Sequence, residues 1–137
     1  MRCCAALRLI AAALLSLIAA ACTLAYGTPT PFPTPNAPRV EFLAPANNSQ
    51  FVEGAEIIVE ILAQDAGVGV ARVEFQVDGI TVSEALPVVS GAVPVFTVRT
   101  NWLAEGVGLH ALAAFAYRPD GFASEPAFVI VEVLPKD

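Results

Sequence analysis

The sequence predicts an all-β domain, a β-sandwich of about seven antiparallel strands, and three observations lead to that prediction. From residue 39 onward no segment shows a helical period of 3.6. Short segments that alternate apolar and polar residues recur along the chain, with turn residues between them. Two of these segments are separated only by Asp78-Gly79, which is a strong signal for a tight β-hairpin. Short strands at this spacing are typical of a sandwich.

The predicted hairpin, residues 70–83 (VARVEFQVDGITVS), is the clearest element. Its first strand has an apolar row on one face and a polar row on the other, formed by Val73, Phe75 and Val77 and by Arg72, Glu74 and Gln76. Asp78-Gly79 tolerates the positive φ that the turn requires, and a β-branched strand follows. We therefore expect one side of this hairpin to face the core.

Further strands are expected on either side of the hairpin, at residues 40–42, 57–63, 96–102, 110–117 and 127–133. Turns are expected at residues 45–49, 65–69, 105–108 and 119–121. Residues 84–94 contain Pro87, Gly91 and Pro94 and are predicted to be irregular. Trp102 ends one of the alternating segments, and we expect its ring in the core.

The N-terminal residues 1–21 are predicted to be a signal peptide. Arg2 and Arg8 are followed by an uncharged apolar run at residues 9–21, which is shorter than the roughly 20 residues of a membrane span. Small residues then precede Cys22. This arrangement resembles the bacterial lipobox, in which the cysteine is lipidated. Two alternatives remain open. Ala19-Ala20-Ala21 also fits ordinary cleavage that would release the protein, and residues 9–26 could stay as an uncleaved anchor.

Residues 22–38 are predicted to hold the lipidated cysteine and a Pro/Thr-rich linker, and residues 39–135 the folded domain. Proline at alternate positions between Pro29 and Pro35 favours polyproline II over helix or sheet. Fully extended at about 3.1 Å per residue, the linker would reach roughly 50 Å. It is therefore expected to act as a semi-rigid spacer.

Charge and cysteine content restrict the function. Arg2 and Arg8 belong to the leader, which leaves five basic residues against 13 acidic ones, so that nucleic acid is not an expected partner. Because Cys3, Cys4 and Cys22 all precede the domain, it must fold without a disulfide.

Several segments together resemble the bacterial immunoglobulin-like (Ig-like) domains of exported and cell-surface proteins. The resemblance is carried by the turn at residues 47–49, the loop at 65–67, the VARVEFQVDG segment at 70–79, Trp102, the HALAAFA strand at 110–116 and the valine alternation at 129–133. It implies a sandwich fold and a role as a spacer, an adhesion module or a carbohydrate- or protein-binding accessory. It implies no shared catalytic residue and no cofactor.

Two kinds of chemistry have weak support in the sequence. Asp65, Asp120 and Glu125, on loops expected to be neighbours, could supply some of the oxygen ligands of a calcium ion, but loop aspartates more often cap turns. Catalysis is not expected, because His110 is the only histidine and no nucleophile stands at a catalytic spacing. We expect His110 to be exposed or at the rim of the sandwich.

Strand parity predicts a contact surface. If Glu132 faces water, Phe128 and Ile130 share its outward face, and Phe115 and Tyr117 point outward from the preceding strand. Neighbouring strands would gather these four residues into one exposed apolar patch, unless residues 84–94 or the linker cover it. A homodimer and an envelope partner would both explain such a patch.

The expected function is thus a non-catalytic module, tethered to the membrane of the bacterial cell envelope by a lipid or peptide anchor, for binding, adhesion or presentation. The partner would be a protein, a carbohydrate ligand or a second copy. A small envelope hydrolase or an accessory domain of a secreted enzyme is the alternative.

Overall fold

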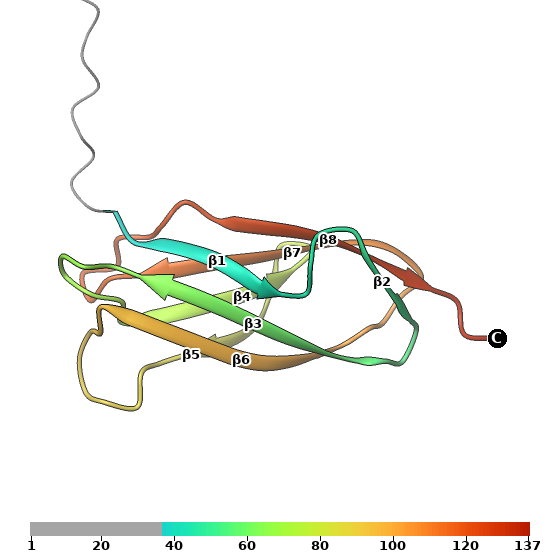
Figure 1. The fold of residues 1–137 in the computed structure, drawn as a ribbon, viewed down its shortest axis with the longest axis horizontal. Helices are drawn as coiled ribbons and strands as arrows, with labels where there is room; N and C mark the ends of the chain where they lie inside the picture. The colour runs from blue at the N-terminus through green and yellow to red at the C-terminus, as the bar shows by residue number, and fades with distance from the viewer. Residues whose placement is uncertain (1–36) are drawn as a thin grey trace, which may run out of the picture. The chain divides into compact units, whose positions relative to one another are not determined.

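The computed structural model describes residues 37–137, and these residues form strands and no helix. The predicted signal peptide, Cys22 and most of the predicted linker lie outside the described residues. The strands are β1 (Arg39–Ala44), β2 (Ser49–Val52), β3 (Glu56–Gln64), β4 (Arg72–Val77), β5 (Ile80–Ala85), β6 (Val95–Leu103), β7 (Gly108–Tyr117) and β8 (Ala127–Leu134). Figure 1 shows them as two layers.

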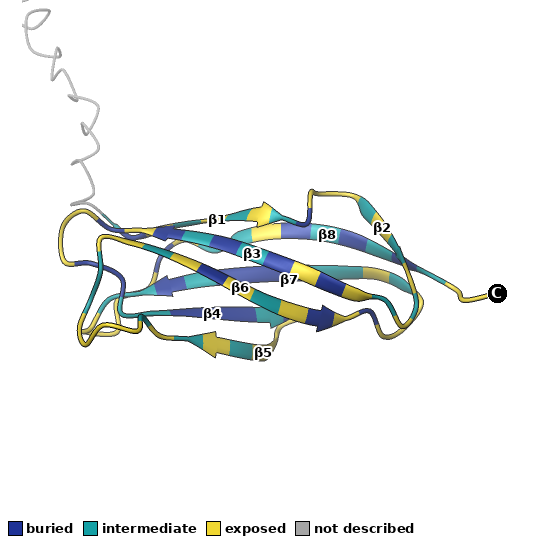
Figure 2. Ribbon diagram, turned by 60° about the horizontal axis from the view of Figure 1, so that its bottom comes forward, coloured by how far each residue is buried: buried dark blue, intermediate teal, exposed yellow. Residues whose placement is uncertain are grey.

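One layer is a three-stranded sheet in the order β1-β3-β6, and the other is a five-stranded sheet in the order β2-β8-β7-β4-β5. The apolar rows of the two sheets face each other, so that buried and less buried residues alternate along the central strands (Figure 2). The largest fully buried side chains are Phe75, Ile61, Leu112, Val59, Val70, Val73, Val131 and Val133. The predicted all-β sandwich is confirmed.

The hairpin forms as predicted, between β4 and β5. Both turn residues have positive φ, 52° at Asp78 and 79° at Gly79, which is the backbone that a two-residue hairpin turn requires. The register shifts by one residue after Phe75, because Gln76 pairs with Thr81 whereas Phe75 pairs with Ser83. Val82 is thus the extra residue of a β-bulge on the edge strand β5.

Two details differ from the prediction: there are eight strands, and one pair is parallel. The additional strand is β2, which pairs with β8 in parallel, with Ser49 opposite Val131 and Val52 opposite Leu134. After β1 the chain crosses from the three-stranded sheet to the five-stranded sheet at residues 45–48. Four residues are too few for a recognisable alternation, and the partner strand lies some 80 residues away, so no local pattern could predict this pairing.

The chain's loops gather at two opposite ends of the sandwich. At the end we call the N-terminal end, the described chain enters at Ala37, and the loops at residues 65–71, 86–94 and 118–126 lie together (Figure 1). Backbone hydrogen bonds join these loops, from Asp65 to Pro94 and from Ala71 to Tyr117. At the C-terminal end lie the turns at residues 53–55, 78–79 and 104–107 and the last residues, 135–137.

Trp102 is a core residue, as expected. Its side chain is 8% exposed, and it lies near the C-terminal end, opposite Ile57 of β3. Its indole ring meets the imidazole of His110 edge to face, with 5.5 Å between the ring centroids. The tryptophan therefore closes the core beneath the β6–β7 turn.

Candidate functional site

The candidate site is the outer face of the five-stranded sheet, which points away from the core. The register aligns its side chains in rows across β4, β7 and β8. Gln76, Ala113 and Phe128 form one row, Glu74 lies opposite Phe115, Arg72 opposite Tyr117, and Ala111 opposite Ile130. The alternate residues Leu112, Ala114 and Ala116 are fully buried on the core side. The four residues predicted to form a contact surface, Phe115, Tyr117, Phe128 and Ile130, thus share one face.

These four residues are not equally accessible. Phe128 is 62% exposed, whereas Phe115, Tyr117 and Ile130 are half-buried. The rings of Phe115 and Tyr117 lie side by side, with 6.4 Å between their centroids. Within the part of the chain that the structure describes, Phe128 is the most accessible aromatic residue of this face. The apolar contact area therefore centres on β8.

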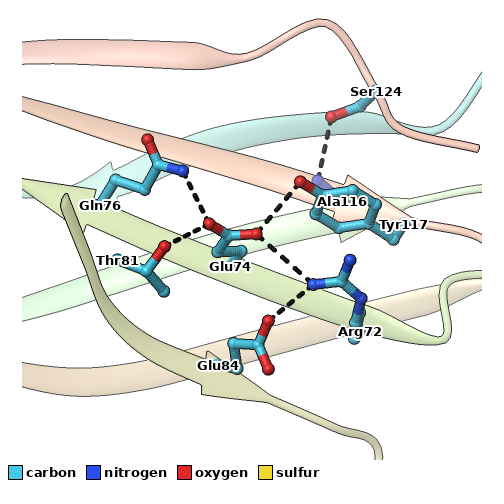
Figure 3. Close-up of polar contacts among 8 residues, drawn as sticks. All are labelled: Arg72, Glu74, Gln76, Thr81, Glu84, Ala116, Tyr117 and Ser124. Atoms are coloured by element: carbon cyan, nitrogen blue, oxygen red, sulfur yellow. Dashed lines mark hydrogen bonds and ion pairs between the residues drawn. The ribbon is translucent and has the colours of Figure 1, made fainter. Parts of the chain in front are cut away.

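A polar cluster around Glu74 occupies the neighbouring part of the same face (Figure 3). One carboxylate oxygen, Oε1, accepts hydrogen bonds from Thr81 Oγ1 at 2.6 Å and Gln76 Nε2 at 2.7 Å. The other, Oε2, accepts from Tyr117 Oη at 3.1 Å and Arg72 Nη1 at 3.4 Å. Arg72 also donates to Glu84 of β5 at 2.7 Å. The cluster thus joins β4, β5 and β7.

The cluster keeps Glu74 ionised although the residue is only 9% exposed. The hydrogen bonds from Thr81 and Gln76 lower the pKa of Glu74, and they outweigh the opposing effect of burial. Burial and the neighbouring carboxylate raise the pKa of Tyr117, which therefore stays a hydrogen-bond donor. Because every member has its partner, the side chains of this region are held in fixed positions.

Tyr117 belongs to this cluster, and this corrects the expectation of a purely apolar patch. The Arg72 guanidinium lies 3.6 Å from the centroid of the Tyr117 ring and covers it. A guanidinium stacks well on an aromatic ring because it is planar and weakly hydrated. The outer face therefore has two parts, an apolar part with Phe128 and Ile130 and a fixed polar part with Arg72, Glu74 and Tyr117, and Phe115 lies between them.

The three calcium candidates are not brought together as a site. Asp65 is buried, and both of its carboxylate oxygens accept hydrogen bonds from Arg118, through Nε and Nη2. This hydrogen-bonded guanidinium lowers the pKa of Asp65, with the Gly67 amide as a further donor. Arg118 thus holds the position next to Asp65 that a cation would need.

Asp120 and Glu125 have other surroundings. The Asp120 carboxylate accepts a hydrogen bond from the Phe122 amide two residues later, as turn-capping aspartates do. Glu125 and Asp65 both line a pocket between β1, the end of β3 and residues 122–126. Among residues 37–137 no group of three or more acidic, histidine or cysteine side chains could hold a metal ion.

His110 is less exposed than expected, with 15% of its side chain accessible. Its Nδ1 lies 2.7 Å from Asp78 Oδ2 and its Nε2 lies 2.7 Å from the Gly106 carbonyl oxygen. Both partners are acceptors, so the imidazolium, with a proton on each ring nitrogen, can donate to both of them, whereas the neutral ring can donate to one. The Gly106 carbonyl and the Asp78 carboxylate accordingly raise the pKa of His110.

This arrangement is unlike a catalytic triad. In a triad the imidazole nitrogen remote from the carboxylate faces a nucleophile, whereas here it faces a backbone carbonyl. Asp78 also accepts a hydrogen bond from the Ala111 amide, and its own amide donates to the Ala111 carbonyl. The pair therefore ties the hairpin turn to β7 and the β6–β7 turn.

Sequence reasoning missed the partners of Glu74, Asp65 and His110. The partners of Asp65 and His110 lie far along the chain, since Arg118 is 53 residues from Asp65 and Asp78 is 32 residues from His110. Of the partners of Glu74, Tyr117 is 43 residues away, whereas Arg72, Gln76 and Thr81 lie within seven residues of it. One signal was available for the third pair, since Asp78 and His110 both belong to the segments that carried the Ig-like resemblance. A charged residue in such a segment indicates a partner elsewhere in the fold.

Comparison with solved structures shows the same fold in proteins of low sequence identity. The fibronectin(III)-like modules of Clostridium thermocellum CbhA are 23% identical, with a TM-score of 0.56 over 72% of this chain and 100% of theirs. The CARDB domain of Pyrococcus furiosus PF1109, solved with di-metal ions, is 14% identical with a TM-score of 0.56, over 72% of this chain and 94% of that one. The Streptococcus sanguinis SrpA adhesin R347E mutant is 12% identical with a TM-score of 0.50, over 74% of this chain and 57% of that one.

Comparison with curated proteins gave no match. The bacterial Ig domain family model matches residues 38–110, from the start of β1 to the histidine that holds the hairpin turn, which is more than half of the 137-residue chain. The matched residues include the whole of the β4–β5 hairpin and Trp102. The chain therefore belongs to the bacterial Ig domain family.

Proposed function

We propose that this protein is a non-catalytic module of the bacterial cell envelope, tethered to the membrane through Cys22, that binds a protein or carbohydrate partner on the outer face of its five-stranded sheet. The observation that carries the proposal is the pairing of exposed Phe128 and half-buried Ile130 with a fixed polar cluster on one sheet. An apolar anchor next to satisfied polar groups is the composition of a binding interface.

The family supports this role. Bacterial Ig domains are typically non-catalytic. They occur mainly in exported and surface proteins, where they serve as adhesion or accessory modules. A surplus of acidic over basic residues favours a neutral or basic partner over a second copy of the same acidic domain. A flat face with fixed side chains also requires little ordering on binding, which lowers the entropic cost of association.

The tether is supported by the leader. An apolar run ends in small residues directly before Cys22, and a Pro-rich segment follows. Lipidation at this cysteine would leave the domain outside the cytoplasm on a spacer. No helix that is long and apolar enough to cross a membrane is found among the residues that the structure describes.

Replacing Phe128 and Phe115 by serine tests the binding face. We expect the double variant to fold and to lose partner binding by at least about 30-fold, since a central aromatic anchor typically contributes 2 kcal/mol or more. The measurement is capture of envelope components by the immobilised protein, followed by titration of the captured component.

A matched control removes exposed apolar residues from the other sheet, with Val95→Ser and Leu103→Ser in β6. The control should bind like the wild type. Equal binding by both double variants would contradict the proposed face, and circular dichroism must show that both remain folded.

The tether has its own test. Cys22→Ser should move the protein from the membrane fraction to the soluble fraction, and the intact mass of wild-type protein extracted from membranes should include the acyl chains. A variant that stays on the membrane would contradict lipid anchoring and leave the uncleaved anchor as the explanation.

A further inference from the structure

The N-terminal end of the sandwich exposes more apolar surface than its loops need for folding. Five large apolar side chains lie exposed on its three loops: Val68, Leu86, Val88, Val89 and Phe122. Val88, at the tip of the β5–β6 loop, is fully exposed, and Leu86 is 70% exposed. Loop tips of soluble domains are usually polar, and a group of exposed apolar side chains tends to mark a contact surface.

Two of the three loops carry no free charge. Residues 85–98 include no charged side chain, and the only one at residues 65–71 is Asp65, which is buried against Arg118. The third loop holds Asp120 and Glu125 on either side of Phe122. The tips of the loops at 65–71 and 86–94 thus carry no exposed charge, whereas Phe122 on the third loop lies between two acidic residues.

The C-terminal end also exposes apolar residues, but together with acids. Val107 and Leu109 are accessible there, Glu105 and Asp137 are exposed in the neighbouring turn and tail, and Glu53 is half-buried. Such a surface is repelled by anionic lipid headgroups and costs free energy to dehydrate. The uncharged tips of the N-terminal end avoid both penalties.

The position of the chain's entry indicates what the apolar tips contact. The described chain begins at Ala37, and Arg39 pairs with Gln64, the last residue before the loop at 65–71. The segment that leads back to Cys22 therefore leaves the domain at the same end as the apolar loops. On the proposed tether, this end stays within roughly 50 Å of the bilayer.

We propose that the N-terminal end is a membrane-contact surface, on which the tips of the loops at 65–71 and 86–94 enter the headgroup region of the lipid bilayer. The inference rests on the proposed lipid tether. A tether keeps the local concentration of lipid surface on the order of millimolar or above, so a contact too weak to hold a free domain suffices. The linker then limits the distance between the domain and the bilayer, and the contact of the loops with the lipid holds the domain at the bilayer surface.

The test compares two leucines of equal exposure at opposite ends. Leu86 is 70% exposed and Leu109 is 72% exposed. Leu86→Cys and Leu109→Cys are made in the full-length protein, extracted from membranes, labelled with an environment-sensitive fluorophore and reconstituted into phosphatidylethanolamine and phosphatidylglycerol vesicles that contain spin-labelled lipids. We expect quenching at position 86 to be at least about two-fold stronger than at position 109.

A charge in the loop supplies a second comparison. Val89→Glu in the Leu86→Cys protein should reduce quenching to the level at position 109, because a carboxylate in the headgroup region is costly. Val107→Glu, at a valine of similar exposure, should leave the quenching at position 86 unchanged. Neither substitution touches the core, so both variants should fold.

Three results would overturn the inference: equal quenching at positions 86 and 109, quenching that Val89→Glu does not reduce, and a spectral shift at position 86 that appears without vesicles and grows with protein concentration. The last result would show that the N-terminal end contacts a second copy of the chain. Failure of the tether is seen separately, as an unacylated intact mass with Cys22 taking up label. In that case the inference falls with the tether, because an untethered domain does not meet lipid at the local concentration that the contact needs.

Discussion

The two ends of this sandwich are each fastened by one ion pair between distant segments, but the pairs differ in chemistry. At the N-terminal end, buried Asp65 is held by Arg118 through two hydrogen bonds. At the C-terminal end, the more accessible Asp78 is held by His110, whose second nitrogen donates to a backbone carbonyl. A guanidinium keeps its charge at every physiological pH, whereas an imidazolium does not.

The difference shows how a domain without disulfides secures its loops in two ways. The Asp65–Arg118 pair holds the N-terminal end across the physiological pH range, because the guanidinium keeps its charge there and lowers the pKa of Asp65. The Asp78–His110 pair holds the hairpin turn against β7 most strongly when His110 is protonated. Substitutions at the two ends should therefore respond differently to pH.

The largest effect is expected from Trp102→Ala at the C-terminal end. Removing a buried tryptophan typically costs about 3 to 5 kcal/mol, a severe loss for a domain whose total stability is about 5 to 15 kcal/mol. Thermal unfolding followed by circular dichroism measures the loss. Leu103→Ala, the exposed neighbour, should change stability by less than about 0.5 kcal/mol.

If Trp102→Ala unfolds at the temperature of the wild type, then Trp102 does not close the core. The edge-to-face contact with His110 would then contribute nothing measurable to the C-terminal end.

Asp65→Asn should have the next largest effect, at the N-terminal end. The amide cannot pair with the Arg118 guanidinium, which is left close to a buried neutral group. We expect a lower unfolding temperature and faster hydrogen exchange at the Gly67 amide, which donates to Asp65 Oδ1. Glu60→Gln is the control, because Glu60 pairs with the exposed Arg99 at 3.5 Å. Equal effects of the two substitutions would show that the buried pair contributes no more to the stability of the domain than a surface pair does.

His110→Asn should produce a smaller effect that depends on pH. The folded state raises the pKa of His110, so its stabilisation is fully present below the ordinary histidine pKa of about 6.5 and is lost as pH rises through the folded-state pKa. The difference in unfolding temperature between wild type and variant should therefore shrink as the pH rises from about 6 to 9. A difference that stays constant across this range would mean that His110 acts only through its packing on Trp102.

The smallest effect is expected from calcium. Since Arg118 occupies both carboxylate oxygens of Asp65, neither calcium nor a chelator should change the unfolding temperature. A stabilisation by calcium that saturates and is lost in Asp65→Asn would restore the calcium site considered for Asp65, Asp120 and Glu125. The measurement is differential scanning calorimetry with magnesium as the control ion.

Local patterns in the sequence predicted the elements of the fold and the facing of their side chains. The alternation around Phe75 and the Asp78-Gly79 turn identified the hairpin, and the apolar row of Val73, Phe75 and Val77 is buried as the alternation predicts. These features depend on residues one or two positions apart, which is the range over which a strand's pattern repeats.

Features that depend on pairing between distant segments could not be predicted in the same way. Glu74 was expected to face solvent, and it does lie on the outer face, but Tyr117, 43 residues away, donates a hydrogen bond to it, and Arg72 covers the ring of that tyrosine. Likewise, nothing next to Asp65 in the sequence indicates that Arg118 will reach it. The candidate binding face was therefore predictable as a face, whereas the polar half that shapes it was not.

The parallel pairing of β2 with β8 has a mechanical consequence. When the domain is pulled between its N-terminal tether and its C-terminus, β2 is drawn toward its start and β8 toward its end. In parallel strands these two directions slide the pair lengthwise, so the hydrogen bonds from Ser49–Val131 to Val52–Leu134 bear the load together. Antiparallel strands pulled at one shared edge would instead open one bond at a time. On the proposed envelope tether, β2, the shortest strand, would thus act as a clamp against tension.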